Sequence, residues 1–99
     1  IDGPVEQVMS SYPILDKLRA FGLEAAEVDG HDFDALEAAF AQAKTVKGKP
    51  FAIVMRTTKG KGVSYMENQV GWHGKAPNGE QYEQAMAELR AKLAELEAE

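Results

Sequence analysis

The sequence predicts an α/β fold in which helices cover both faces of a parallel sheet, with an amphipathic helix at its carboxyl end. Two observations support this prediction. The apolar spacing changes along the chain in the order helix, strand, helix, strand, and the connections are short. The run FAIVMRT, from Phe51 to Thr57, is apolar on both faces for most of its length, as in a buried parallel sheet. Because two strands do not make a stable sheet alone, we expect this sheet to be part of a larger one.

The first 30 residues are predicted to hold one short helix and one strand. Residues 1–11 are expected to be turn-like, because Asp2, Gly3 and Pro4 interrupt regular structure. Apolar residues then recur at helical spacing over 14–21, and Gly22 offers the left-handed position that ends many helices. The segment LEAAEVDG that follows is a weak strand ending in an Asp-Gly turn.

A second helix is predicted before the apolar run and ends near Lys44. Asp34, with Glu37 three residues later, resembles a capping box at its start. One side of this helix carries an apolar stripe, formed by Phe33, Leu36, Phe40 and Ala43. The glycine and proline of the segment KGKP then break the helix.

The last predicted helix covers residues 79–99 and has an apolar seam. The seam consists of Tyr82, Met86, Leu89, Leu93 and Leu96. It spans only about two heptads, so docking on a neighbouring surface is a better interpretation than a sustained coiled coil. That surface could belong to the same molecule or to a partner.

Composition limits the possible functions. Ninety-nine residues make one small domain or part of one. The absence of cysteine fits a reducing compartment, and the start of the chain has no targeting signal, so we predict a cytoplasmic protein without membrane association. A net charge of -5 argues against nucleic-acid binding. Residues 44–62 nevertheless carry only basic charges, which creates a local positive patch.

The loop TTKGKGVSYMENQVGWHGKAP, residues 57–77, is the best candidate for a site. It follows the carboxyl end of a predicted strand, where ligands bind in open α/β sheets. Gly60 and Gly62 permit close backbone approach, and neighbouring N–H groups could form an anion-binding concavity. Lys59 and Lys61 add positive charge, and His73 can donate or accept a hydrogen bond. Each feature alone also fits an exposed turn or a packed histidine.

A metal site at Asp29, His31 and Asp32 is the less favoured interpretation of the segment DGHD. Three ligands within four residues would have difficulty surrounding one ion. Helix N-termini favour aspartate, so a capping role is the better prediction.

Taken as a unit, the loop resembles the corresponding loop of transketolases. There, a lysine before a Gly-x-Gly and a Trp-His-Gly occur at the separation seen here between Lys59 and His73. The segments IDGPVEQV and AFGLEAAEVDGHDFDALEAAFAQAK also resemble the stretches leading to that loop, so the likeness covers nearly the whole chain. It is greatest for the amino-terminal subunit of transketolases that are split into two polypeptides.

The resemblance implies a site and a reaction. Transketolases use thiamin diphosphate with Mg²⁺ to move a two-carbon ketol unit between sugar phosphates, in pathways such as the pentose phosphate pathway. By the family pattern, Lys59 and His73 contact the cofactor's diphosphate, and His73 also faces the substrate as a catalytic residue. No residue here matches the family's metal ligands. The companion carboxyl-terminal subunit would be the partner, in a homodimer or heterotetramer.

By the same resemblance, residues 1–99 are expected to be the carboxyl-terminal half of a thiamin diphosphate-binding domain, on its diphosphate side. We expect the chain to be inactive alone. Two alternatives remain open: a non-catalytic binding or assembly module with the same fold, and part of 1-deoxyxylulose-5-phosphate synthase, which has a similar KGKG loop. The segment Trp72-His73-Gly74 favours transketolase.

Overall fold

The structure, a computed structural model, describes residues 1–98, which form two compact units. The first unit consists of Gly3–Thr57 and contains the sheet. The second consists of Ile1–Asp2 together with the residues from Thr58 onward, and contains the loop that bears the candidate site.

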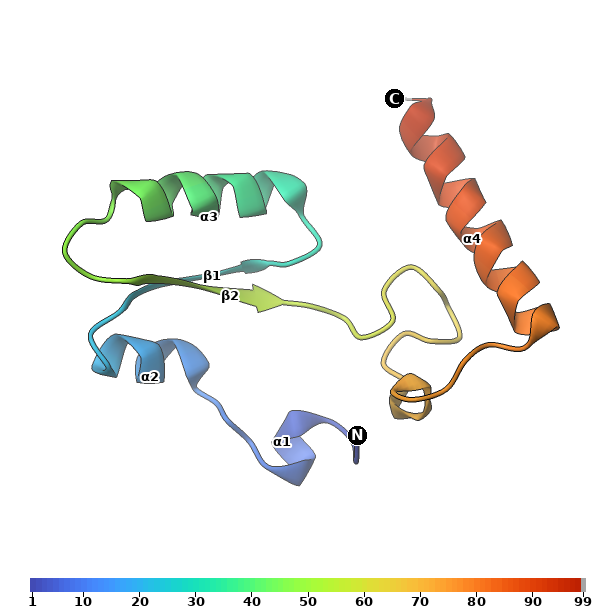
Figure 1. Ribbon diagram of the computed structural model, residues 1–99, viewed down its shortest axis with the longest axis horizontal. Helices are drawn as coiled ribbons and strands as arrows, with labels where there is room; N and C mark the ends of the chain where they lie inside the picture. Colours follow the sequence, from blue (N-terminus) through green and yellow to red (C-terminus); the bar gives the residue numbers. More distant parts are fainter. Residues whose placement is uncertain (99) are drawn as a thin grey trace. The chain divides into compact units, whose positions relative to one another are not determined.

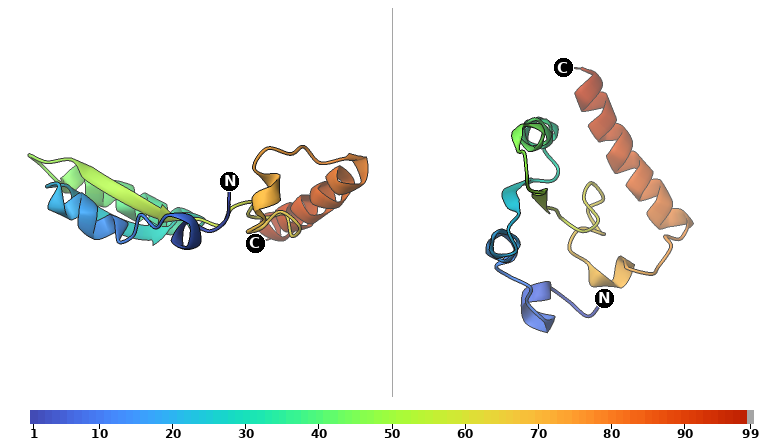
Figure 2. Two further views of the ribbon diagram at one scale, coloured as in Figure 1. Left: turned by 90° about the horizontal axis from the view of Figure 1, so that it is seen from below. Right: turned by 60° about the vertical axis from the view of Figure 1, so that its left-hand side comes forward.

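The sheet unit has two parallel strands between two helices. Strand β1 (Glu24–Asp29) pairs with β2 (Phe51–Arg56), with Glu24 opposite Phe51 and Asp29 opposite Arg56. Helix α2 (Ile14–Ala20) lies on one side of this pair and α3 (Phe33–Thr45) on the other (Figure 1). The right-hand view of Figure 2 looks along both helices, with the strands between them. The predicted α/β architecture is therefore confirmed.

Helix α2 ends where its glycine predicts. Gly22 has φ +89°, in the left-handed region, and its N–H donates to the carbonyl of Arg19 at 2.9 Å. The N–H of Leu23 donates to the carbonyl of Leu18 at 3.2 Å. These two bonds form a Schellman motif, which satisfies carbonyls that the helix end would leave unpaired.

The predicted start of α3 was wrong by two residues. The N-cap is Asp32, whose extended backbone (ψ 110°) lets its side chain accept a hydrogen bond from the N–H of Ala35 at 3.1 Å. Asp34 is already in the first turn, where its charge favours the positive end of the helix dipole. The helix ends at Thr45, one residue beyond the prediction.

Residues 1–11 are not wholly turn-like, because Val5–Val8 form the one-turn helix α1. Pro4 precedes this turn, and its carbonyl accepts hydrogen bonds from the N–H groups of Gln7 and Val8. Pro4 is the N-cap, with extended backbone (φ -60°, ψ 140°), so a residue that was expected to interrupt regular structure directly precedes a helical turn.

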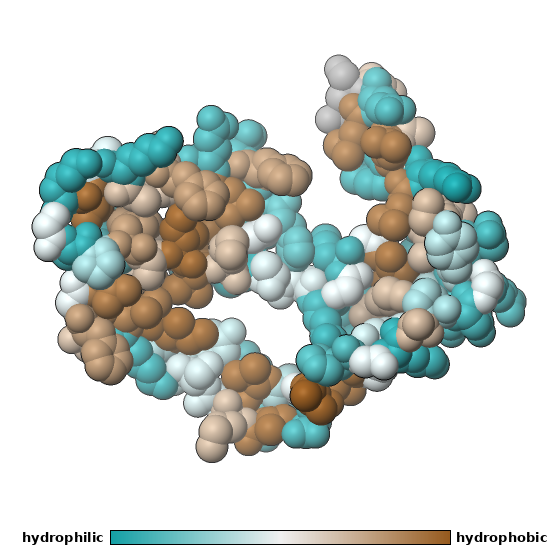
Figure 3. All heavy atoms as spheres, in the orientation of Figure 1, coloured by the Kyte–Doolittle hydropathy of each residue, from teal (hydrophilic) through white to brown (hydrophobic). Residues whose placement is uncertain are grey.

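Much of the apolar surface is open. Among residues 1–98, the buried hydrophobic residues are all alanines: Ala25, Ala39 and Ala85. Figure 3 shows apolar atoms at the surface of the sheet unit and along the carboxyl-terminal helix. Residues 51–54 of β2 are only half-buried and Met55 is exposed, whereas the apolar run predicted a strand of a buried parallel sheet. The reason is that a two-stranded sheet has no further strands beside it.

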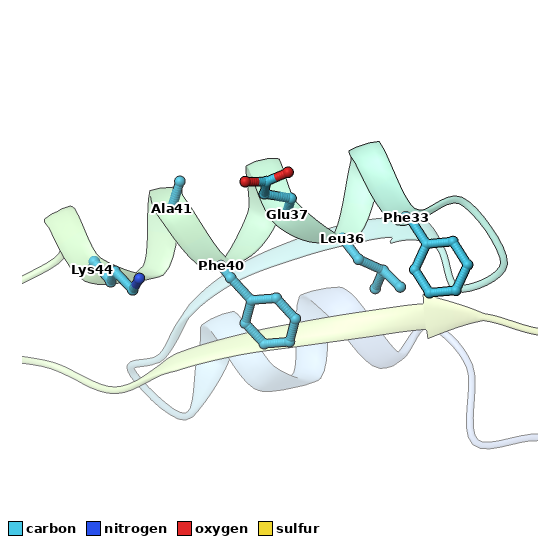
Figure 4. A pocket seen from close by; sticks show the side chains of 6 residues that line it. All are labelled: Phe33, Leu36, Glu37, Phe40, Ala41 and Lys44. Carbon is cyan, nitrogen blue, oxygen red and sulfur yellow. The ribbon is translucent and has the colours of Figure 1, made fainter.

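The predicted stripe on α3 exists but is uncovered. Phe33, Leu36 and Phe40 leave the helix on the same side and line an open hollow (Figure 4). Phe33 is 87% exposed and Phe40 is 56% exposed. None of the residues that line this hollow belongs to loop 57–77, and only Glu37 and Lys44 among them are charged. The stripe is suited to packing against another apolar surface.

The second unit contains the short 3₁₀ helix η1 (Val70–Trp72) and the long helix α4 (Gly79–Glu97). Helix α4 begins with a capping box, in which Asn78 and Gln81 each accept a hydrogen bond from the other's backbone N–H. The predicted seam lies on this helix, and four of its side chains are 44–55% exposed: Tyr82, Leu89, Leu93 and Leu96. Among residues 1–98, no helix has the length and apolar character required to cross a membrane.

Candidate functional site

The loop after β2 folds back on itself at Gly60. The N–H of Asn68 donates to the carbonyl of Lys59 at 2.9 Å, which closes this part of the loop. Gly60 has φ +73°, and a β-carbon added there would lie 2.5 Å from the carbonyl oxygen of Met66. Glycine is therefore required here, because any side chain would collide with the returning backbone.

A second contact closes the other half of the loop. The indole N–H of Trp72 donates to the carbonyl of Tyr65 at 3.0 Å, and the two rings lie 5.2 Å apart at 54°. The ammonium of Lys75 is 4.9 Å from the centre of the Trp72 ring, a cation–π contact. His73 follows Trp72 as the C-cap of η1, and its N–H donates to the carbonyl of Val70 at 3.1 Å. The position of His73 is thus fixed through its neighbour Trp72.

The structure places the two predicted site residues, Lys59 and His73, in the same folded loop. Both are exposed. Within residues 1–98, neither the ammonium of Lys59 nor the imidazole of His73 makes a hydrogen bond or an ion pair. Lys61 and Lys75 differ, because the first pairs with Glu67 and the second with the Trp72 ring. Lys59 and His73 are therefore available to a ligand.

Three backbone donors beside the two glycines, those of Lys61, Gly62 and Val63, are already occupied. The N–H of Gly62 donates to the carboxylate of Glu67 at 3.0 Å, and the ammonium of Lys61 lies 3.9 Å from the same oxygen. The N–H groups of Lys61 and Val63 donate to loop carbonyls. The anion-binding concavity expected from the sequence thus holds the chain's own carboxylate. Our sequence reasoning missed Glu67, although it is the one acidic residue in a basic loop.

Helix α4 holds the middle of the loop through Ser64 and Tyr65. The N–H and hydroxyl of Ser64 donate to the two carboxylate oxygens of Glu88, at 2.7 and 2.6 Å. The side-chain amide of Gln84 also donates to Glu88, at 3.0 Å. The hydroxyl of Tyr65 donates to the carbonyl of Gln81 at 2.6 Å. Sequence reasoning missed Glu88 too, since nothing in the spacing relates it to a residue 24 positions earlier.

The hydrogen bonds to Glu88 have an electrostatic consequence. Those from the Ser64 hydroxyl and N–H, and then that from Gln84, lower the pKa of the Glu88 carboxyl below its ordinary value of 4.5. Because the pKa is lower in the folded protein than its ordinary value, the contact stabilises the fold at pH values above the ordinary pKa. This stabilisation is lost as the pH falls through the lowered pKa. Glu88 is therefore ionised at neutral pH and holds Ser64 there.

The segment DGHD has the structural role that was favoured for it. Asp32 caps α3, and the side chain of Asp29 accepts a hydrogen bond from the N–H of His31 at 2.9 Å. Within the part of the chain that the structure describes, no three histidine or acidic side chains form a group that could hold a metal ion.

Replacing Gly60 with alanine is expected to disrupt the loop, at a cost of about 2–4 kcal/mol from the strained φ and the collision with Met66. Gly71→Ala is the matched control, because a β-carbon there meets no atom within 4 Å. Hydrogen exchange of the peptide over residues 60–68 provides the measurement. Equal exchange in the two variants would show that Gly60 does not determine the loop's conformation.

Comparison with known proteins places the chain in a family. Residues 1–95 match the family described as the thiamine diphosphate binding domain of transketolase. The chain is 38% identical over 99 residues, all of its length, to one of the subunits of the apulose-4-phosphate transketolase of Phocaeicola vulgatus. It is 39% identical over 89 residues, 90% of its length, to the 6-deoxy-6-sulfo-D-fructose transketolase subunit SqwG of a Clostridium species. It is 36% identical over 90 residues, 91% of its length, to the transketolase of Pongo abelii.

The chain is shorter than these relatives. It spans 35% of the first, 32% of the second and 14% of the third. The likeness nevertheless extends over almost every residue of the chain, including the loop with Lys59 and His73. The chain therefore belongs to the thiamine diphosphate-binding domain family of transketolases.

Proposed function

We propose that this chain supplies diphosphate and substrate contacts to a transketolase, which transfers a two-carbon ketol unit between sugar phosphates. Family membership supports the cofactor, and the names of the relatives support the reaction. One structural observation carries the assignment of residues: the loop fixes Lys59 and His73 in one folded segment and leaves both side chains without a partner among residues 1–98.

These two residues fit a diphosphate by their chemistry. An ammonium is a compact cation with three donors, and an imidazole can donate to an anionic oxygen. Lys61 does not fit as well, because Glu67 already balances its charge. We therefore assign Lys59 and His73 as the cofactor-binding residues of this chain.

When bound, thiamin diphosphate would supply a carbon nucleophile and an electron sink for the breaking of the carbon–carbon bond. Lys59 neutralises negative charge on the diphosphate and so holds the cofactor in one orientation. His73, the proposed catalytic residue, donates a hydrogen bond to a substrate oxygen that becomes more negative in the transition state. The loop contributes rigidity, because Trp72 and its contact with Tyr65 fix the backbone beside His73.

The metal ion and the partner subunit would come from outside this chain. We propose that Mg²⁺ accompanies the cofactor, with its ligands supplied from outside this chain. We also propose a companion subunit, since two relatives are named as transketolase subunits, within a homodimer or a heterotetramer. A cytoplasmic location and a role in the pentose phosphate pathway complete the proposal, and the absence of cysteine fits that location.

The test is a donor and acceptor panel on the protein that carries this chain, assembled with its companion subunit. We expect two-carbon transfer to ribose 5-phosphate from xylulose 5-phosphate, or from the ketoses that the relatives' names contain, and only when thiamin diphosphate and Mg²⁺ are present. Activity with pyruvate and glyceraldehyde 3-phosphate instead would support a 1-deoxyxylulose-5-phosphate synthase. Absence of thiamin diphosphate binding by the assembled protein would support a non-catalytic module.

A further inference from the structure

Two hydrogen bonds join Glu88 to Ser64. Ser64 uses its N–H and its hydroxyl, and Glu88 uses both carboxylate oxygens. A bidentate, charge-assisted arrangement of this kind is stronger and more directional than a single neutral hydrogen bond. Gln84, one turn earlier on α4, donates to the same carboxylate and orients it. Both partners belong to the same compact unit.

Ser64 is well placed to control the loop. It lies between Lys59 and His73 in sequence, and its neighbour Tyr65 accepts the indole hydrogen bond of Trp72. Tyr65 is in turn fixed to α4 by its hydroxyl, which donates to the Gln81 carbonyl. Ser64 and Tyr65 are thus adjacent anchors of the loop on α4, and through Tyr65 they are linked to Trp72 and the backbone that carries His73.

We propose that Glu88 is a positioning residue for cofactor binding: its carboxylate holds the loop in the conformation that presents Lys59 and His73 to the diphosphate. This inference rests on the proposed function. Without Glu88 the loop samples more conformations, and the cofactor must order it on binding, which reduces affinity. In this role Glu88 acts through its hydrogen bonds with Ser64.

The test compares Glu88→Ala with Glu83→Ala in the full protein assembled with its companion subunit. Glu83 lies on the same helix, and its replacement removes the same charge. Within residues 1–98 its carboxylate has no hydrogen bond or ion pair, so no contact with the loop is lost. We expect Glu88→Ala to raise the Kd of thiamin diphosphate about tenfold, with kcat at saturating cofactor within about twofold of wild type. Hydrogen exchange of residues 60–68 should also become faster. Glu83→Ala should change neither quantity.

Two further variants keep the test decisive if Glu88→Ala folds poorly. Ser64→Ala removes only the hydroxyl donor, and we expect the Kd to rise about threefold. In Glu88→Gln the amide can still accept from the Ser64 N–H, so affinity should be partly restored relative to alanine.

The outcomes separate this inference from the proposed function. Wild-type affinity and exchange in both Glu88→Ala and Ser64→Ala would overturn the positioning role, while the proposed function would stand if Lys59→Ala still weakens binding. A wild-type protein that does not bind thiamin diphosphate would overturn both. Loss of kcat at saturating cofactor, with an unchanged Kd, would also contradict the role that we assign to Glu88.

Discussion

Replacing Lys59 with alanine is expected to weaken the binding of thiamin diphosphate by about 10- to 100-fold. The reason is that a hydrogen bond to a charged group contributes about 1.5–3 kcal/mol, and each 1.4 kcal/mol is a tenfold change in Kd. Lys59 has no alternative anionic partner among residues 1–98, so its charge is available to the diphosphate. Calorimetric titration of the assembled protein with thiamin diphosphate and Mg²⁺ is the measurement.

Lys61→Ala is the matched control for Lys59→Ala. It removes the same charge from the same loop, but Lys61 already lies 3.9 Å from the Glu67 carboxylate. We expect Lys61→Ala to change the Kd by no more than about threefold, which is the effect expected from removing a screened surface charge. Equal losses in the two variants would mean that the cofactor responds to the positive patch as a whole and not to Lys59.

Replacing His73 with alanine is expected to lower kcat by about 100- to 1,000-fold, the effect of removing one donor to a developing oxyanion. The Kd of thiamin diphosphate should rise by a smaller factor, because Lys59 still holds the diphosphate. Steady-state kinetics at saturating cofactor separates the two effects. His31→Gln is the control, since His31 lies in the turn before α3, and it should leave kcat within about twofold of wild type.

A different result would change the role of His73. If the Kd rises while kcat at saturating cofactor stays at the wild-type value, His73 binds the cofactor but takes no part in the chemical step. If neither quantity changes, both assignments of His73 are wrong.

The fold could largely be predicted from local patterns. The apolar spacing over residues 14–21 and Gly22 predicted α2 and its end, and the apolar run from Phe51 predicted β2. These predictions succeeded because periodicity and glycine conformation are properties of short segments. The start of α3 was missed since Asp32 and Asp34 are both plausible caps, and only the backbone angle at Asp32 decides between them.

The site could be predicted only in part. The residue types around Lys59 and His73, together with the family resemblance, indicated an anion-binding loop. Local spacing could not show that Glu67 occupies the N–H of Gly62, or that Glu88 on a later helix binds Ser64. These contacts depend on how the loop returns on itself and on α4, which are tertiary features. The exposure of Phe33 also could not be read from the stripe, because periodicity shows an apolar face and not what covers it.

A crystal structure of the assembled protein with thiamin diphosphate and Mg²⁺ tests the central claim most directly. We predict that the Lys59 ammonium and a ring nitrogen of His73 each lie about 3 Å from oxygens of the same diphosphate, within hydrogen-bond distance. A bound diphosphate contacted by neither residue, with residues 59–73 well ordered, would contradict the account.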